Sequence, residues 1–270
     1  MQNSVITCQE HHDQSDNKMR EPIDIRRQFE RDGHILLRNF FSAQKIEEVK
    51  AEANALLERK DLQDTNNLRC RWATIDGKCC FETYDPVIDI SERCRELARS
   101  PELLNLLAHL YGEPACLFKD KLIYKPPGCK GYGLHQDWIA WDGFPRSFLT
   151  VLIPIDAATR ENGCTIVYPG YHQQGALSKE DGQYHELPID CVKEDDAVFL
   201  EMMPGDVAIF GGFVPHRSAT NLSDTWRRQL FISYNKLSDG GDQYKSHYQE
   251  FHQWLRKRYA EHNKFDVYFK

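Results

Sequence analysis

Short apolar runs separated by turn residues dominate the second half of this chain. After Pro114, each of the segments CLFKDKLIYK, FLTVLIPI, CTIVYP, AVFL, DVAIFGGF and RQLFISYN is followed or preceded by Gly, Pro, Asn or Asp. Strands of four to eight residues with turn signals at this density are typical of a β-sandwich or a β-barrel. The pattern therefore predicts a mainly β core with helices outside it.

Helical patterns flank this β region on both sides. Ser42 is a candidate N-cap, and apolar residues follow it at helical spacing. We predict these elements: a short helix ending at Gly33 and then a strand, a helix over 43–60, a loop or hairpin over 61–85, one or two helices over 91–111 broken at Pro101, and a charged C-terminal helix that packs on its own barrel. Residues 1–21 are polar and are predicted to form a flexible tail, with a single domain over 22–270.

Composition excludes several classes of protein. The 270 residues are 41% hydrophobic and 28% charged, as in ordinary globular proteins. A formal net charge of −7 argues against a uniformly basic nucleic-acid-binding surface. No stretch approaches the ~20 apolar residues of a membrane-spanning helix. Without a secretory signal, the nine irregularly spaced cysteines predict reduced thiols and a cytoplasmic protein. For the oligomeric state, a monomer and a homodimer both stay open.

The segment GYGLHQDW places a histidine and an aspartate two residues apart. On a strand, His135 and Asp137 would point to the same face. His216 follows much later, in GGFVPHRSATN. Two imidazoles and one carboxylate form the facial triad of non-haem Fe(II) oxygenases. The H-x-D pattern alone is weak, because such a pair is more often a hydrogen-bonded structural pair.

An arginine lies eleven residues after His216, just before the strand-like segment QLFISYN. A dicarboxylate co-substrate that chelates iron at one end needs a cation at the other. Arg227 could provide this cation as a bidentate, permanently charged clamp. Taken alone, Arg227 is better interpreted as a solvated charge at a strand edge.

The combination of these segments resembles the phytanoyl-CoA dioxygenase family of Fe(II)/2-oxoglutarate-dependent oxygenases. The similar segments cover roughly residues 27–235, in family order: FERDGHILLRNFFS, LIYKPPGCKGYGLHQDW, ENGCTIVYPGYH, PGDVAIFGGFVPHRS and WRRQLFISY. The resemblance implies a double-stranded β-helix, which is a jelly-roll, cupin-like barrel with flanking α-helices.

The same resemblance implies roles for individual residues. His135, Asp137 and His216 would bind Fe(II), Arg227 would pair with the distal carboxylate of 2-oxoglutarate, and Ser218 and Lys121 match further positions that contact this co-substrate. Relatives that halogenate have a small residue where this chain has Asp137, so hydroxylation is favoured. The implied reaction consumes 2-oxoglutarate and O2, hydroxylates an aliphatic C–H, and releases succinate and CO2.

The candidate substrate contacts surround the H-Q-D motif. They are Trp138, Trp141, Arg146 and Lys119. An indole there could contact a substrate ammonium, or simply close the end of the barrel. WDGFPRS is similar to a segment of ectoine hydroxylase, and KDKLIYKPPGCKGYGLHQDW to hydroxylases of 2-aminoethylphosphonate.

We therefore expect a small polar or zwitterionic substrate, with a 2-aminoethylphosphonate-like compound favoured. The alternatives are an acyl-CoA or natural-product hydroxylase of the same family, a cupin-type metal protein that is not an oxygenase, and a non-catalytic binding protein.

Overall fold

The computed structural model describes residues 22–64 and 67–260. The predicted tail over 1–21 lies outside these residues. The helices are α1 (Pro22–Asp32), α2 (Ala43–Leu57), α3 (Glu92–Ala98), α4 (Pro101–Tyr111) and α5 (Tyr244–Ala260). The strands are β1 (His34–Leu37), β2 (Cys70–Ile75), β3 (Lys78–Tyr84), β4 (Ala115–Lys125), β5 (Leu149–Pro154), β6 (Thr165–Val167), β7 (Val198–Phe199), β8 (Val207–Gly211), β9 (His216–Ser218) and β10 (Arg227–Lys236).

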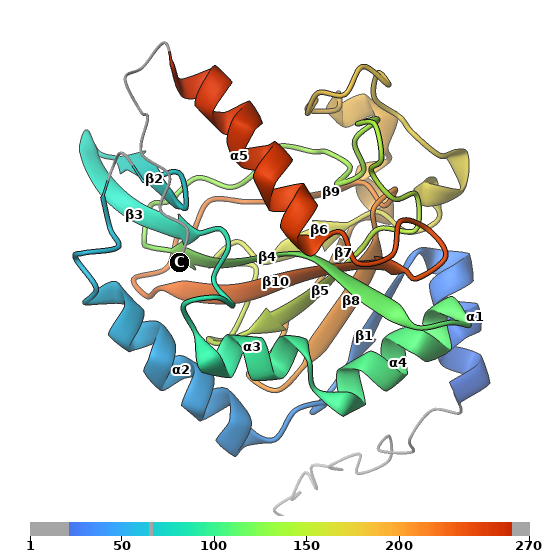
Figure 1. The fold of residues 1–270 in the computed structure, drawn as a ribbon, viewed down its shortest axis with the longest axis horizontal. Coiled ribbons are helices and arrows are strands. Elements are labelled where there is room, and N and C mark those ends of the chain that lie inside the picture. The colour runs from blue at the N-terminus through green and yellow to red at the C-terminus, as the bar shows by residue number, and fades with distance from the viewer. Residues whose placement is uncertain (1–21, 65–66, 261–270) are drawn as a thin grey trace, which may run out of the picture.

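The strands form two antiparallel sheets. The large sheet has the order β1-β8-β5-β10-β4-β3-β2, and the small sheet has the order β7-β6-β9. Strands distant in sequence are neighbours: β5 pairs with both β8 and β10, and β10 pairs with β4 along its whole length. The small sheet packs over one face of the large sheet, as in a jelly roll (Figure 1).

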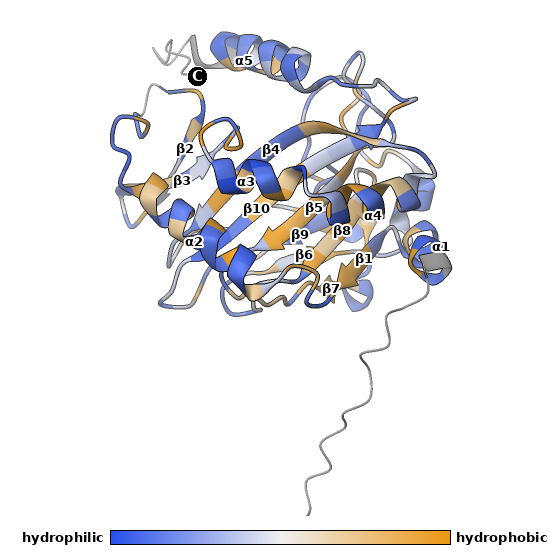
Figure 2. Cartoon of the chain, turned by 60° about the horizontal axis from the view of Figure 1, so that its bottom comes forward, coloured by the Kyte–Doolittle hydropathy of each residue, from blue (hydrophilic) through white to orange (hydrophobic). Residues whose placement is uncertain are grey.

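One face of the large sheet packs against α2, α3 and α4. Alternate residues of β5, such as Val151 and Ile153, join apolar residues of these helices in the largest core cluster. This alternation follows from the two-residue period of a strand. The three helices lie together on this side of the sheet (Figure 1), and Figure 2 shows apolar strands behind helices whose outer faces are hydrophilic.

The opposite face of the large sheet is partly polar. The residues of β5 that alternate with the core include Leu152, which packs toward the small sheet, and Thr150. On β4, the same alternation directs Lys119 and Lys121 into a cavity between the sheets. This segment therefore presents Lys119 and Lys121 inside the barrel, while Leu122 and Tyr124 join the core that packs against the helices.

The predicted helix boundaries are confirmed with small shifts. The Ser42 hydroxyl accepts a hydrogen bond from the Lys45 N–H at 3.3 Å, so it is the N-cap of α2, which ends three residues before the predicted position 60. Pro101 separates α3 from α4 because it occupies the first turn of α4, where no N–H is needed. Residues 70–84 form the β2–β3 hairpin.

The C-terminal helix packs on its own barrel, as predicted. The Tyr248 hydroxyl of α5 donates to the backbone oxygen of Asp120 on β4 at 2.7 Å and contacts the Asp85 carboxylate at 3.1 Å. Figure 1 shows α5 lying across β4, on the side away from α2. In the described part of the chain, no helix is long and apolar enough to cross a membrane.

Candidate metal centre and adjoining cavities

The structure brings together the two histidines and the aspartate of the predicted triad. His135 and Asp137 do not lie on a regular strand, so that prediction was wrong. A single bridge joins His135 to His216 of β9, with N–H···O distances of 3.0 and 2.9 Å. The chain approaches β9 so closely at Gly131 that a Cβ there would lie 1.7 Å from the Ser218 oxygen, and this close approach replaces a regular ladder.

The three side chains converge with the geometry of a metal site. Their ligand atoms all lie within 4.8 Å of one another. The Nε2 atoms of His135 and His216 lie 3.7 and 3.6 Å from Asp137 Oδ1. The Nδ1 atoms lie 2.8 and 3.0 Å from the carbonyl oxygens of Gly133 and Val214. Because a carbonyl only accepts, each Nδ1 carries the proton and each Nε2 lone pair is left for a metal.

The protonation states also suit a metal ion. Burial, and then the neighbouring His216, lower the pKa of His135 to about 3, so its imidazole is neutral at pH 7. Burial opposes ionisation of Asp137, but His216, Lys121 and His135 outweigh it and lower its pKa to about 2. Thr150 donates to Asp137 Oδ2 at 2.9 Å. Neutral imidazoles and an oriented carboxylate are what Fe(II) binding requires.

A narrow cavity extends from the triad to the predicted co-substrate residues. Arg227, Ser218 and Lys121 all line it, together with the three triad residues. The Arg227 guanidinium is buried and bonds to the side chain of Gln229, while its Nε has no partner among the described residues. Burial lowers its pKa to about 10, so it stays charged at pH 7. A buried cation with unused donors fits a carboxylate.

A larger cavity, here called the main cavity, lies on the other side of the triad. Its volume is about 390 Å³. Three cations line it: Arg71 of β2 and Lys119 and Lys121 of β4. The Asp85 carboxylate is buried beside them, with Oδ2 at 2.7 Å from Arg71 Nη2 and 3.4 Å from Lys119 Nζ. Burial, and then Lys119, lower the pKa of Lys121 to about 8.

Aromatic side chains form much of the remaining wall. The loop after Asp137 contributes Trp141 and Phe144, and α5 contributes His247, Phe251 and Trp254. Tyr184 and Glu186 lie on a loop that reaches the main cavity from the small sheet, with the Tyr184 ring centroid 5.3 Å from that of His135. The main cavity thus combines cations, aromatic rings and a carboxylate.

The four predicted substrate contacts divide into two pairs. Lys119 and Trp141 line the main cavity. Trp138 and Arg146 do not, which corrects that part of the prediction. The Trp138 indole is buried and stacks on Phe213 at 4.9 Å between ring centroids, and the Arg146 guanidinium lies 5.1 Å from both rings. Trp138 therefore packs the barrel end, where a large apolar ring gains from burial.

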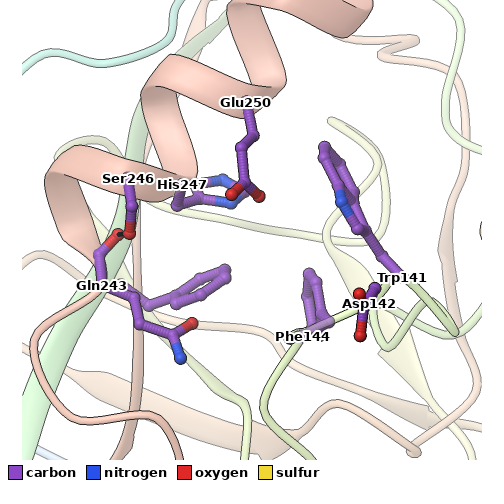
Figure 3. A pocket seen from close by; sticks show the side chains of 9 residues that line it. Trp141, Asp142, Phe144, Gln243, Ser246, His247 and Glu250 are labelled. Carbon is purple, nitrogen blue, oxygen red and sulfur yellow. Dashed lines mark hydrogen bonds between the residues drawn. The ribbon is translucent and has the colours of Figure 1, made fainter.

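A second, smaller pocket of about 170 Å³ adjoins the main cavity. The two share Trp141, Phe144 and His247 as a common wall. Figure 3 shows two carboxylates at this smaller pocket. Asp142 comes from the loop after Asp137, and Glu250 comes from α5. Both residues are exposed.

Sequence reasoning missed several residues that line the main cavity or support the triad. They are Arg71, Thr150, Tyr184, Glu186 and His247. Thr150 had a usable signal, because a polar residue interrupts the apolar run FLTVLIP. The others lie on a hairpin, a loop and a helix whose approach to the triad depends on tertiary packing.

The fold and the arrangement of the triad define a non-haem metal oxygenase of the double-stranded β-helix type. Residues 29–229 match the phytanoyl-CoA dioxygenase (PhyH) family, and the chain belongs to that family. An ectoine dioxygenase structure from Sphingopyxis alaskensis, with 2-oxoglutarate and 5-hydroxyectoine, is similar at a TM-score of 0.66 and 23% identity, over 84% of this chain and 83% of that one. This likeness confirms the predicted fold.

Two curated relatives act on phosphonates by name. A methylphosphonate hydroxylase from Gimesia maris is 38% identical over 151 residues, and the match spans 54% of this chain and 55% of the relative. A 2-aminoethylphosphonate dioxygenase from an uncultured bacterium is 29% identical over 79% of this chain and 81% of its own length. The family and its relatives confirm the predicted class, a 2-oxoglutarate-dependent non-haem iron dioxygenase.

Proposed function

We propose that this enzyme hydroxylates an aliphatic C–H of a small phosphonate, with 2-aminoethylphosphonate-like compounds favoured. The observation that carries the proposal is the group of three cations, Arg71, Lys119 and Lys121, in the main cavity beside the triad. A phosphonate group suits such a cluster, because it carries a negative charge of between one and two and all its oxygens accept hydrogen bonds. The two phosphonate-acting relatives support the same substrate class.

In this proposal the triad holds the metal. His135, Asp137 and His216 ligate Fe(II), which when bound supplies the reaction with dioxygen. The carbonyls of Gly133 and Val214 fix the imidazoles, and Thr150 fixes the carboxylate. This support keeps the three ligand atoms facing one point before the metal arrives.

The co-substrate occupies the narrow cavity. The distal carboxylate of 2-oxoglutarate pairs with Arg227, and the Ser218 hydroxyl adds a hydrogen bond. Lys121 lines both cavities, so its ammonium lies between the co-substrate and the substrate. Arg227 has no ion-pair partner among the described residues, so 2-oxoglutarate displaces no internal carboxylate when it binds.

The substrate binds in the main cavity with its phosphonate toward the three cations. This placement directs the carbon chain to the triad, while the rings of Phe144 and Trp141 exclude water from it. Two expectations from the sequence stay predictions: a cytoplasmic location and a monomeric or homodimeric state.

The test measures succinate and hydroxylated product with Fe(II), 2-oxoglutarate and one candidate at a time. 2-Aminoethylphosphonate, ectoine and an acyl-CoA represent the three substrate groups. We expect coupled product only with the phosphonate, and none from the variant His135→Ala, which lacks one metal ligand. Coupled succinate formation only with the acyl-CoA would refute the proposal and leave the dioxygenase class intact.

A further inference from the structure

Glu186 contributes a carboxylate to the main cavity, where Arg71, Lys119 and Lys121 contribute positive charges. Among the described residues that line the main cavity, the carboxylates are those of Asp137 and Glu186. Asp137 belongs to the triad, and Thr150 holds it. Glu186 forms no hydrogen bond or ion pair with any residue in the described ranges 22–64 and 67–260. It therefore has its full capacity to accept hydrogen bonds from a ligand.

This carboxylate lies beside the triad. A Cβ added to Gly133 would lie 2.6 Å from Glu186 Cδ and 2.7 and 2.8 Å from its two oxygens. Glu186 thus packs directly against the backbone of Gly133, the residue whose carbonyl oxygen orients His135. The Leu187 N–H donates to the Leu134 oxygen at 2.6 Å and holds the two segments together.

The surroundings of Glu186 favour an organic cation. The nearby Tyr184 ring lies against His135, and Trp141 lines the same cavity. The electron-rich faces of such rings attract ammonium groups. Glu186 also raises the pKa of Tyr184, which burial and then this carboxylate bring to about 12, so the two side chains share one environment. A carboxylate with aromatic neighbours complements an amine, whereas the three cations complement an anion.

We propose that Glu186 is a specificity-determining residue that binds a substrate ammonium group while Arg71, Lys119 and Lys121 hold its phosphonate. The inference rests on the proposed function and narrows it from phosphonates in general to zwitterionic aminophosphonates. Recognition of both ends orients the carbon between them toward the triad, because a ligand held at two points has less freedom to rotate.

The smaller pocket of Figure 3 offers the competing place for the ammonium group. Its carboxylates, Asp142 and Glu250, are also without ion-pair partners among the described residues, and Trp141 and Phe144 line it. It lies behind the shared wall, however, and the triad residues do not line it. Glu250 is therefore a matched control for Glu186: each is an exposed glutamate near Trp141, and only Glu186 lines the main cavity.

The experiment compares the wild type, Glu186→Gln and Glu250→Gln on two substrates, 2-aminoethylphosphonate and ethylphosphonate. The second substrate is the first without its amine. Removing a hydrogen bond to a charged group lowers affinity by about 10-fold or more. We expect Glu186→Gln to raise the KM for 2-aminoethylphosphonate by about that factor and to change the KM for ethylphosphonate less than about 2-fold. Glu250→Gln should change neither.

Three results would overturn the inference while the proposed function stands. The first is an equal loss on both substrates by Glu186→Gln. The second is a selective loss by Glu250→Gln, which would place the ammonium group in the smaller pocket. The third is a wild type that prefers ethylphosphonate. If Glu186→Gln does not fold, Glu186→Asp, which keeps the charge but shortens the reach, should show a smaller selective rise in KM. Turnover of neither phosphonate by the wild type would refute the proposed function and this inference together.

Discussion

Replacing Asp85 with asparagine should destabilise the protein at neutral pH and leave it nearly unaffected in strong acid. The Asp85 side chain is 1% exposed, and its Oδ2 contacts Arg71 and Lys119 at 2.7 and 3.4 Å. Its Oδ1 lies 3.1 Å from the Tyr248 hydroxyl of α5. This carboxylate therefore connects two of the three cations of the main cavity to α5, the helix that covers the cavity.

The size of the effect follows from the pKa of this carboxyl. Burial alone would raise it, but Lys119, then Arg71 and Lys121, outweigh burial and lower it from 3.8 to about 2. One pKa unit corresponds to about 1.4 kcal/mol of differential interaction. The shift therefore represents roughly 2 to 3 kcal/mol of folding free energy at pH 7.

The pH dependence has a definite sign. A folded-state pKa below the unfolded value means that the stabilisation is present above the unfolded pKa and is lost as the pH falls through the folded pKa. The difference between the wild type and Asp85→Asn should therefore be roughly 2 to 3 kcal/mol at pH 7, shrink below about pH 4, and be small near pH 2.

Urea unfolding at pH 7, 4 and 2.5, followed by tryptophan fluorescence, measures this difference. Asparagine has nearly the same shape and keeps a polar group beside Tyr248, so the variant tests the charge. Glu201→Gln is the control, because Glu201 is exposed and pairs with Arg160 at 3.3 Å on the surface. Such pairs contribute about 0 to 1 kcal/mol. A pH-independent difference for Asp85→Asn, or one no larger than the control's, would refute the reasoning.

Three further predictions concern the candidate site. Arg227→Lys should raise the KM for 2-oxoglutarate about 10-fold or more, since lysine keeps the charge but loses the bidentate geometry; an unchanged KM would remove Arg227 from the co-substrate pocket. Thr150→Val deletes the hydrogen bond to Asp137 and should weaken Fe(II) binding about 10- to 100-fold in an anaerobic titration; equal affinity would contradict this support. Because the pKa of Lys121 is lowered to about 8, kcat/KM for an anionic substrate should fall as the pH rises through about 8. Lys121→Arg should move that fall to higher pH, and an unmoved profile would assign it to another group.

Local rules were sufficient for most of the fold. Ser42 begins α2 and Pro101 begins α4 because capping and the missing proline N–H act within one helical turn. The apolar runs became strands because short continuous apolar segments between turn residues suit strands that are buried on both faces, as β5 is. The segment carrying His135 was the exception, since its single bridge to β9 arises from a backbone approach that only a glycine at 131 allows.

The candidate site was predictable where its residues lie in segments that resemble the family. Residue type alone left His135, Asp137, His216 and Arg227 with weak signals, and it was the resemblance of the surrounding segments to the family that singled them out. Arg71 and Glu186 carry no such signal. Each is one of many charged residues, and its place in the main cavity depends on how a hairpin and a loop pack around the barrel.

Helix α5 lines the main cavity although it lies outside the segment that matches the family. The match to the family ends at residue 229, and α5 begins at Tyr244. Nevertheless α5 contributes His247, Phe251 and Trp254 to the main cavity, whereas the triad and Arg227 all lie within the matched segment. Because α5 lies outside the matched segment, a change in α5 would alter the wall of the main cavity without altering the triad or Arg227.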